Sequence, residues 1–182
     1  MPPYKRPHIP RFRRMAAAAK VSAPAVLEKA VRGFADTERD SFRDAIFRQG
    51  FKSFAAHPLS EKYLARKRAL RRDERVMIAT RHYVNSIKVH RERMDDRSVV
   101  YWIGFDPDAI AWDLHMRPTQ IRLNTVARIH EYGAPGGLSP SAQRIPARPH
   151  WGPHLKAMRG RAPDTRRAIR RAVRAVLERG MR

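Results

Sequence analysis

The spacing of apolar residues changes from helical to strand-like in the middle of this chain and then returns to helical. Residues 86–90 alternate polar and apolar, and 99–105 form a run rich in β-branched and aromatic side chains. This pattern predicts two strands, which we expect to pair as a hairpin around a turn at Asp95 and Asp96. The chain is therefore predicted to adopt an α+β fold, with N-terminal helices, a central antiparallel β-hairpin packed on helices, and a C-terminal basic helix.

Helical periodicity precedes the predicted hairpin. One helix is expected to begin near Ser22 and a second pattern to end near Gly50, with Gly33 and Asp36 marking either a bend or a break between two helices. A short basic helix is expected to begin after Ser60, a residue type that often caps helix N-termini.

The segments after the hairpin are less regular. Residues 108–122 are ambiguous, and we consider a long loop that reaches a neighbouring molecule. Asn124 is expected to cap a short helix that ends at Gly133, followed by a Gly/Pro-rich loop and an extended segment at 144–149. A short helix after this segment and a last helix over 163–179 complete the chain. The predicted organisation is a basic, Pro-rich extended arm at 1–20, an α+β domain at 21–158 and an Arg-rich C-terminal helix at 159–182.

The charge balance constrains the partners of the protein. The 182 residues include 39 Lys and Arg against 17 Asp and Glu, a formal net charge of +22. This charge is self-repelling unless a polyanion or a neighbouring subunit offsets it, and arginine is suited to planar recognition of phosphate and carboxylate. We therefore expect contacts with DNA or with an acidic protein partner, although a solvated face is the ordinary alternative for such a helix. The candidate contact residues are Arg11, Arg13, Arg14, Arg166, Arg167, Arg170, Arg171 and Arg174.

Several functional classes receive no support from the sequence. The absence of cysteine excludes disulfides and thiolate metal sites, and no Gly-rich phosphate loop or nucleophile elbow is present. His150 and His154 have metal-ligand spacing, but Gly152 and Pro153 separate them and no third ligand is nearby. We expect no catalytic residue, no cofactor, no metal and no membrane span. A cleaved transit peptide is an alternative for 1–20, but its four prolines oppose the amphipathic helix that such a peptide needs.

Four segments resemble one family when they are taken in order. They are Leu59-Ser-Glu-Lys-Tyr-Leu-Ala-Arg-Lys67, Met77-Ile-Ala-Thr-Arg-His-Tyr-Val-Asn-Ser-Ile-Lys-Val89, Val126-Ala-Arg-Ile-His-Glu-Tyr-Gly133 and Ile145-Pro-Ala-Arg-Pro149. Together they resemble the neck and tail-completion proteins of long-tailed bacteriophages over about residues 40–160. The chain departs from the family pattern at Arg81, where glycine is usual, and at His150-Trp151, where Phe-Leu is commoner.

The resemblance implies a structural role in a virion assembled in the bacterial host cytoplasm. The protein would form a homo-oligomeric ring, generally of about six subunits, between the portal-side head-completion connector and the tail terminator or tail tube, around viral double-stranded DNA. The residues implied at the ring or partner interface are His130, Glu131, Tyr132, Gly133, Pro146, Arg148, Pro149 and Trp151. For Arg148, a bridge to a neighbouring subunit and an ion pair within the chain are equally compatible with the sequence.

The composition also bears on two other functional classes. An RNA-binding assembly protein of the ribosomal type also has basic extensions, abundant arginine and no cysteine, and it remains the alternative. A basic nuclease would need a cluster of acids, bases or metal ligands that the sequence does not offer.

Overall fold

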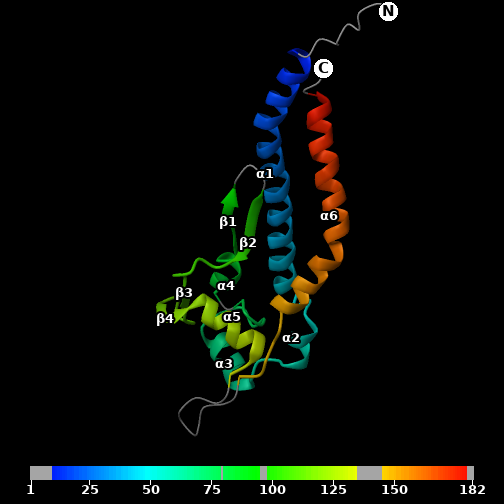
Figure 1. Ribbon diagram of the computed structural model, residues 1–182. Coiled ribbons are helices and arrows are strands. Elements are labelled where there is room, and N and C mark those ends of the chain that lie inside the picture. Colours follow the sequence, from blue (N-terminus) through cyan, green and yellow to red (C-terminus); the bar gives the residue numbers. More distant parts are fainter. Residues whose placement is uncertain (1–9, 79, 95–97, 135–144, 180–182) are drawn as a thin grey trace, which may run out of the picture.

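Two long antiparallel helices dominate the computed structural model, which describes residues 10–78, 80–94, 98–134 and 145–179 (Figure 1). Helix α1 spans Pro10–Phe47 and helix α6 spans Trp151–Arg179, and the two pack against each other. The shorter elements gather around one end of this pair, while the opposite end holds the N-terminal part of α1 and the C-terminal part of α6 (Figure 1). We call the paired helices the stalk and the remainder the body.

Helix α1 is longer than the sequence predicted. The expected extended arm is wrong for residues 10–20, which are helical, and α1 continues through Pro24 and Gly33 without a break. Pro10 occupies the first helical position, where its missing N–H costs nothing, and the Arg, Met and Ala residues that follow are strong helix formers. Residues 1–9 of the predicted arm lie outside the described residues.

Helix α6 is also continuous. The expected boundaries near residues 159 and 163 do not occur, and Pro163 lies inside the helix. A proline removes one backbone hydrogen bond, which costs a helix about 3 kcal/mol. Packing of α6 along α1 offsets this cost, because tertiary contacts supply most of the stability of a protein helix.

The predicted central hairpin is confirmed, and a second hairpin follows it. Strand β1 (Lys88–Met94) pairs antiparallel with β2 (Val99–Gly104), and the turn predicted between them lies outside the described residues. The ambiguous segment contains β3 (Ile110–Trp112) and β4 (Pro118–Arg122), which form a separate two-stranded antiparallel sheet. The mixed α+β fold is thus as expected, with two small sheets instead of one.

Four short helices complete the body. They are α2 (Lys52–Ala56), α3 (Glu61–Ala69), α4 (His82–Asn85) and α5 (Leu123–Tyr132). Ser60 caps α3 as predicted, since its hydroxyl accepts the backbone N–H of Tyr63. Asn124 does not cap α5 as predicted, because β4 leads directly into the helix, which begins at Leu123. The helix ends at Gly133 as predicted. Arg81, which stands where the resemblance expects glycine, has a left-handed backbone (φ 57°).

One apolar core joins the stalk to the body. Phe42 and Ile46 from α1 are fully buried against Val84 and Ile87 from the α4 region and Phe105 after β2. Because these residues come from distant parts of the sequence, the core fixes the position of α5 and of the start of α6, where the resemblance places the interface.

Candidate assembly and polyanion-binding surfaces

Glu131 connects helix α5 to the N-terminus of helix α6. Its carboxylate accepts the backbone N–H groups of His150 (2.9 Å), Trp151 (3.0 Å) and Gly152 (2.9 Å). The first N–H groups of a helix have no partner within the helix, and the helix dipole favours a negative charge there. Glu131 therefore caps α6 from another helix, a role that the sequence did not reveal because the two segments are separated by a loop.

Arg148 is buried and makes its contacts within the chain. Its Nε donates to the carbonyl of His57 (2.5 Å), one Nη donates to the carbonyl of Pro58 (3.0 Å), and its backbone N–H donates to the carbonyl of His130 (2.6 Å). Burial leaves Arg148 5% exposed and lowers the pKa of its guanidinium. The sequence left open whether Arg148 bridges to a neighbouring subunit or pairs within the chain. In the structure it bonds within the chain, and its acceptors are backbone carbonyls instead of a carboxylate.

A hydrogen-bonded aromatic cluster surrounds His150. The indole N–H of Trp151 donates to the Tyr83 hydroxyl (3.2 Å), which lies 2.8 Å from His150 Nε2. His150 Nδ1 lies 3.0 Å from the carbonyl of Arg148, so a neutral ring protonated on Nδ1 satisfies every partner. Burial lowers the pKa of His150 and raises that of Tyr83, which keeps both neutral. The arrangement is that of a satisfied polar core.

His130 and His154 each have one buried ring nitrogen without a hydrogen-bond partner among the described residues. Burial lowers the pKa of His130 to about 4, and its Nδ1 has no hydrogen-bond partner. His154 Nε2 lies 3.6 Å from the buried carboxylate of Glu38, which Arg161 holds with two hydrogen bonds. Within the described ranges, no group of three or more His, Cys, Asp or Glu side chains could hold a metal ion.

Gly133 permits the close approach of two chain segments after α5. Its backbone is left-handed (φ 76°), and an added Cβ would lie 2.9 Å from the carbonyl oxygen of Ile145 and 3.1 Å from the backbone nitrogen of Ala147. The eight residues implied at an interface thus form the joint between α5 and α6. Pro146 and Pro149 are half-buried there, whereas Tyr132 is 79% exposed.

Gly133→Ala is expected to lower the free energy of unfolding by about 2 kcal/mol, because it adds a left-handed backbone penalty to a steric clash. Gly160→Ala is the matched control, since a Cβ at this helical position in α6 would meet nothing within 4 Å. The control should raise the free energy of unfolding by about 0.5–1 kcal/mol. Urea unfolding measures both, and equal effects of the two substitutions would contradict the structural role of Gly133.

A stripe of arginines follows α6 along the stalk. Arg167, Arg170, Arg171 and Arg174 recur at helical spacing and line a hollow of about 930 Å³ with Leu27 of α1. Arg167 pairs with Asp164, whereas Arg166 and the other three are exposed and form no ion pair with any described residue. We call Arg167, Arg170, Arg171 and Arg174 the arginine stripe.

The other predicted basic cluster lies at the same end of the molecule. Arg11, Arg13 and Arg14 belong to the first turns of α1, and this end of α1 lies beside the C-terminal end of α6 (Figure 1). The two clusters that the sequence placed in separate arms therefore both belong to the stalk, with the arginine stripe beside Leu27 of α1.

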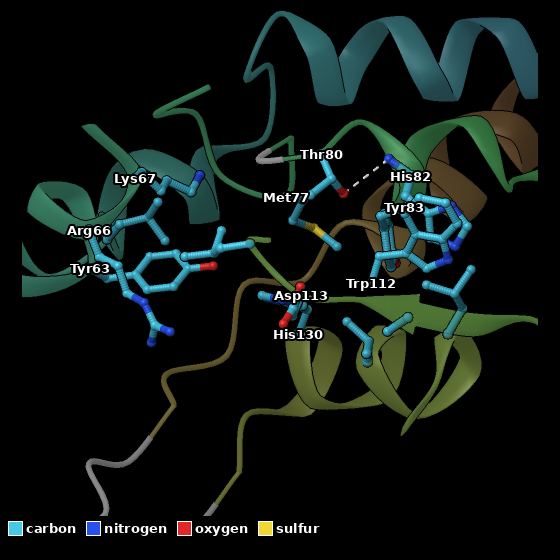
Figure 2. A pocket seen from close by; sticks show the side chains of 15 residues that line it. Tyr63, Arg66, Lys67, Met77, Thr80, His82, Tyr83, Trp112, Asp113 and His130 are labelled. Carbon is cyan, nitrogen blue, oxygen red and sulfur yellow. Dashed lines mark hydrogen bonds between the residues drawn. The ribbon is translucent and has the colours of Figure 1, made fainter. Parts of the chain in front are cut away.

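A pocket of about 330 Å³ lies between α3, α4, β3 and α5 (Figure 2). Lys67 and His130 line it, and Trp112, stacked on His82, forms part of its wall. Lys67 is buried and its ammonium donates to the carbonyl of Arg75 (2.6 Å), while burial lowers its pKa to about 8. Asp113, also in the wall, accepts the backbone N–H groups of His115 and Arg117. Lys67 and Asp113 are thus held by hydrogen bonds within the chain.

Exposed apolar side chains on the β3–β4 hairpin were missed in the sequence. They are Ile110, Trp112, Met116 and Ile121, and each is more than a third exposed. The alternation of Ile110 and Trp112 around Ala111 was a signal for a strand, but the segment is too short for periodicity to identify alone.

Comparisons with protein-family models, curated proteins and solved structures gave no match to this chain. Across the part of the chain that the structure describes, no helix is both long and apolar enough to cross a membrane.

Proposed function

We propose that this protein is a structural subunit of a tailed-phage virion, which forms a ring at the head–tail junction and joins the head connector to the tail around the DNA. The observation that carries the proposal is the arginine stripe, where Arg170, Arg171 and Arg174 lack acidic partners among the described residues. Such cations on one helix face are suited to a phosphate backbone.

The distribution of contacts supports an assembly role over an enzymatic one. Among the buried polar side chains, Glu38, Lys67, Arg148 and His150 have hydrogen-bond partners within the chain, whereas His154 Nε2 has none among the described residues. The exposed side chains include Arg170 and Arg174 of the stalk and apolar residues of the second hairpin, such as Trp112 and Ile121. An exposed basic stripe can bind a polyanion, and an exposed apolar patch can bind protein.

Duplex DNA binding tests the polyanion part of the proposal. Changing the four residues of the arginine stripe to Gln should reduce the slope of log K against log salt by about 3–4, since each phosphate contact contributes about 0.9. The matched control changes four exposed basic residues of the body, Lys52, Lys62, Arg66 and Arg117, to Gln. An equal loss in both variants would show that total charge, and not the stripe, governs binding.

The same titration addresses the RNA-binding alternative. Structured RNA should compete no better than duplex DNA of equal phosphate content, because the stripe offers charge without aromatic stacking partners. A preference for structured RNA of 100-fold or more, on a monomeric protein, would favour the ribosomal-type function instead.

A further inference from the structure

One continuous segment does not share the net positive charge of the chain. Residues 98–134 contain three arginines and four acids, a net charge of −1 in a chain whose net charge is +22. The seven residues are Arg117, Arg122, Arg128, Asp106, Asp108, Asp113 and Glu131. Copies with this overall charge repel one another, so contact between copies is least costly where the surface is neutral. The neutral segment forms β2, both strands of the second hairpin and α5.

The first apolar surface of this segment is the hairpin patch, formed by Ile110, Trp112, Met116 and Ile121. Ile121 is 49% exposed, and the other three are exposed by between 38% and 40%. The hairpin patch contributes little to the core of its own chain. Trp112 lines the pocket beneath the patch, and the other three residues do not.

The second apolar surface is a hollow of about 460 Å³ between β2, α5 and the start of α6, which we call the α5 groove. Its apolar lining consists of Trp102, Ile103, Phe105, Ala127, Tyr132 and Trp151. The polar residues on this groove include Arg128, which is exposed and forms no ion pair with a described residue.

The two surfaces lie on different faces of α5. Leu123, Val126 and His130 of this helix line the pocket beside the second hairpin. Asn124, Ala127 and Glu131 line the α5 groove, which runs along the helix to Tyr132. In Figure 1 the second hairpin and the start of α6 also lie on opposite sides of α5. Two different patches that face different directions favour a head-to-tail contact, which closes into a ring if the rotation permits.

We propose that the hairpin patch of one copy docks into the α5 groove of the next copy. This inference rests on the proposed ring and names the surfaces that build it. Charge complementarity supports a second copy as the occupant. Asp108, beside the hairpin patch, has a side chain that is 91% exposed with a 3.7 Å contact to Arg122, and Arg128 of the groove is a free cation within the described part. The docked arrangement pairs Asp108 of one copy with Arg128 of the next.

Cysteine crosslinking tests the contact directly, because the natural chain contains no cysteine. The double variant Ile121→Cys/Tyr132→Cys places one thiol on the hairpin patch and one in the α5 groove, both at exposed positions. Treatment with a short bis-maleimide should produce a ladder of oligomers up to the ring size, whereas each single variant should stop at dimers. The control Ile121→Cys/Leu155→Cys, with its second thiol at an exposed position of α6, should also stop at dimers.

The outcomes separate this inference from the proposed function. If light scattering detects rings but crosslinking gives no ladder, the docking of these two surfaces is overturned and the proposed ring stands. A protein that stays monomeric and gives no ladder would overturn both proposals.

Exchanging the charges of Asp108 and Arg128 tests the contact independently, because loss and rescue of self-association would not follow from a purely structural role of either residue. Arg128→Glu should weaken self-association about tenfold by opposing Asp108 of the neighbouring copy. The double variant Asp108→Arg/Arg128→Glu should restore it, and failure of this rescue in a folded protein would contradict the predicted pairing. Ile121→Asp should weaken assembly at least tenfold, whereas Leu155→Asp, which changes an exposed apolar residue outside both surfaces, should leave it unchanged.

Discussion

Replacing Glu131 by Ala is expected to lower the free energy of unfolding by about 4 kcal/mol. The carboxylate accepts three backbone N–H groups at the start of α6, and two of these hydrogen bonds are part-buried. Hydrogen bonds to a charged acceptor are stronger than neutral ones, and removing the acceptor leaves its donors without a partner in the protein. The start of α6 is also where α5 and α1 meet it, so the loss extends beyond one helix.

Denaturant unfolding of matched variants checks this expectation. Glu131→Gln retains an oxygen acceptor without the charge and should lose about half as much stability. Glu61→Ala removes an exposed acid from the first turn of α3, where screening by water limits the effect to less than 1 kcal/mol. If Glu131→Ala were as stable as Glu61→Ala, the carboxylate would not be the cap of α6.

Acidification is expected to destabilise the protein between pH 6.5 and pH 4 because His130, His150 and His154, whose pKa values are lowered by burial, must become charged. The pKa of His130 is lowered from 6.5 to about 4 by burial, with nearby positive charge on Arg148 and, when protonated, His150 as further causes. The neutral ring is therefore favoured in the folded state, and its stabilising effect is complete above pH 6.5 and is lost as the pH falls to about 4. For His130 this loss amounts to about 3 kcal/mol. Burial also lowers the pKa of His150, so it adds to the loss in the same direction.

A pH series of unfolding curves, monitored by tryptophan fluorescence, measures this dependence. His130→Gln removes the titrating ring and should flatten the curve between pH 6.5 and pH 4, whatever its effect on stability at neutral pH. His115→Gln, at an exposed position on the second hairpin, is the control and should leave the slope unchanged. An unaltered slope in His130→Gln would show that other groups cause the acid sensitivity.

The sequence predicted those elements whose signals are local. The first hairpin was recognised from β-branched and aromatic residues at 99–105, the N-terminus of α3 from Ser60, and the end of α5 from Gly133. For these elements the local sequence preference agrees with the final fold.

Longer-range effects explain the errors in the sequence prediction. Pro24 and Pro163 were expected to mark helix boundaries, but packing between α1 and α6 carries both helices through them. Arg148 binds carbonyls about 90 residues earlier in the chain, and Glu131 caps a helix about 20 residues later. No sequence spacing reveals such partners, so the contacts that Arg148 and Glu131 make within the chain could not be predicted.

The central claim is that the body assembles copies of this chain into a ring while the stalk binds DNA. Light scattering of the purified protein at moderate salt, after nuclease treatment, tests it most directly, because nuclease removes any nucleic acid that could bridge copies of so basic a chain. The account predicts a discrete oligomer of about six subunits, whose mass falls to that of the monomer in Ile121→Asp. A strict monomer that changes mass only when structured RNA is added would contradict it.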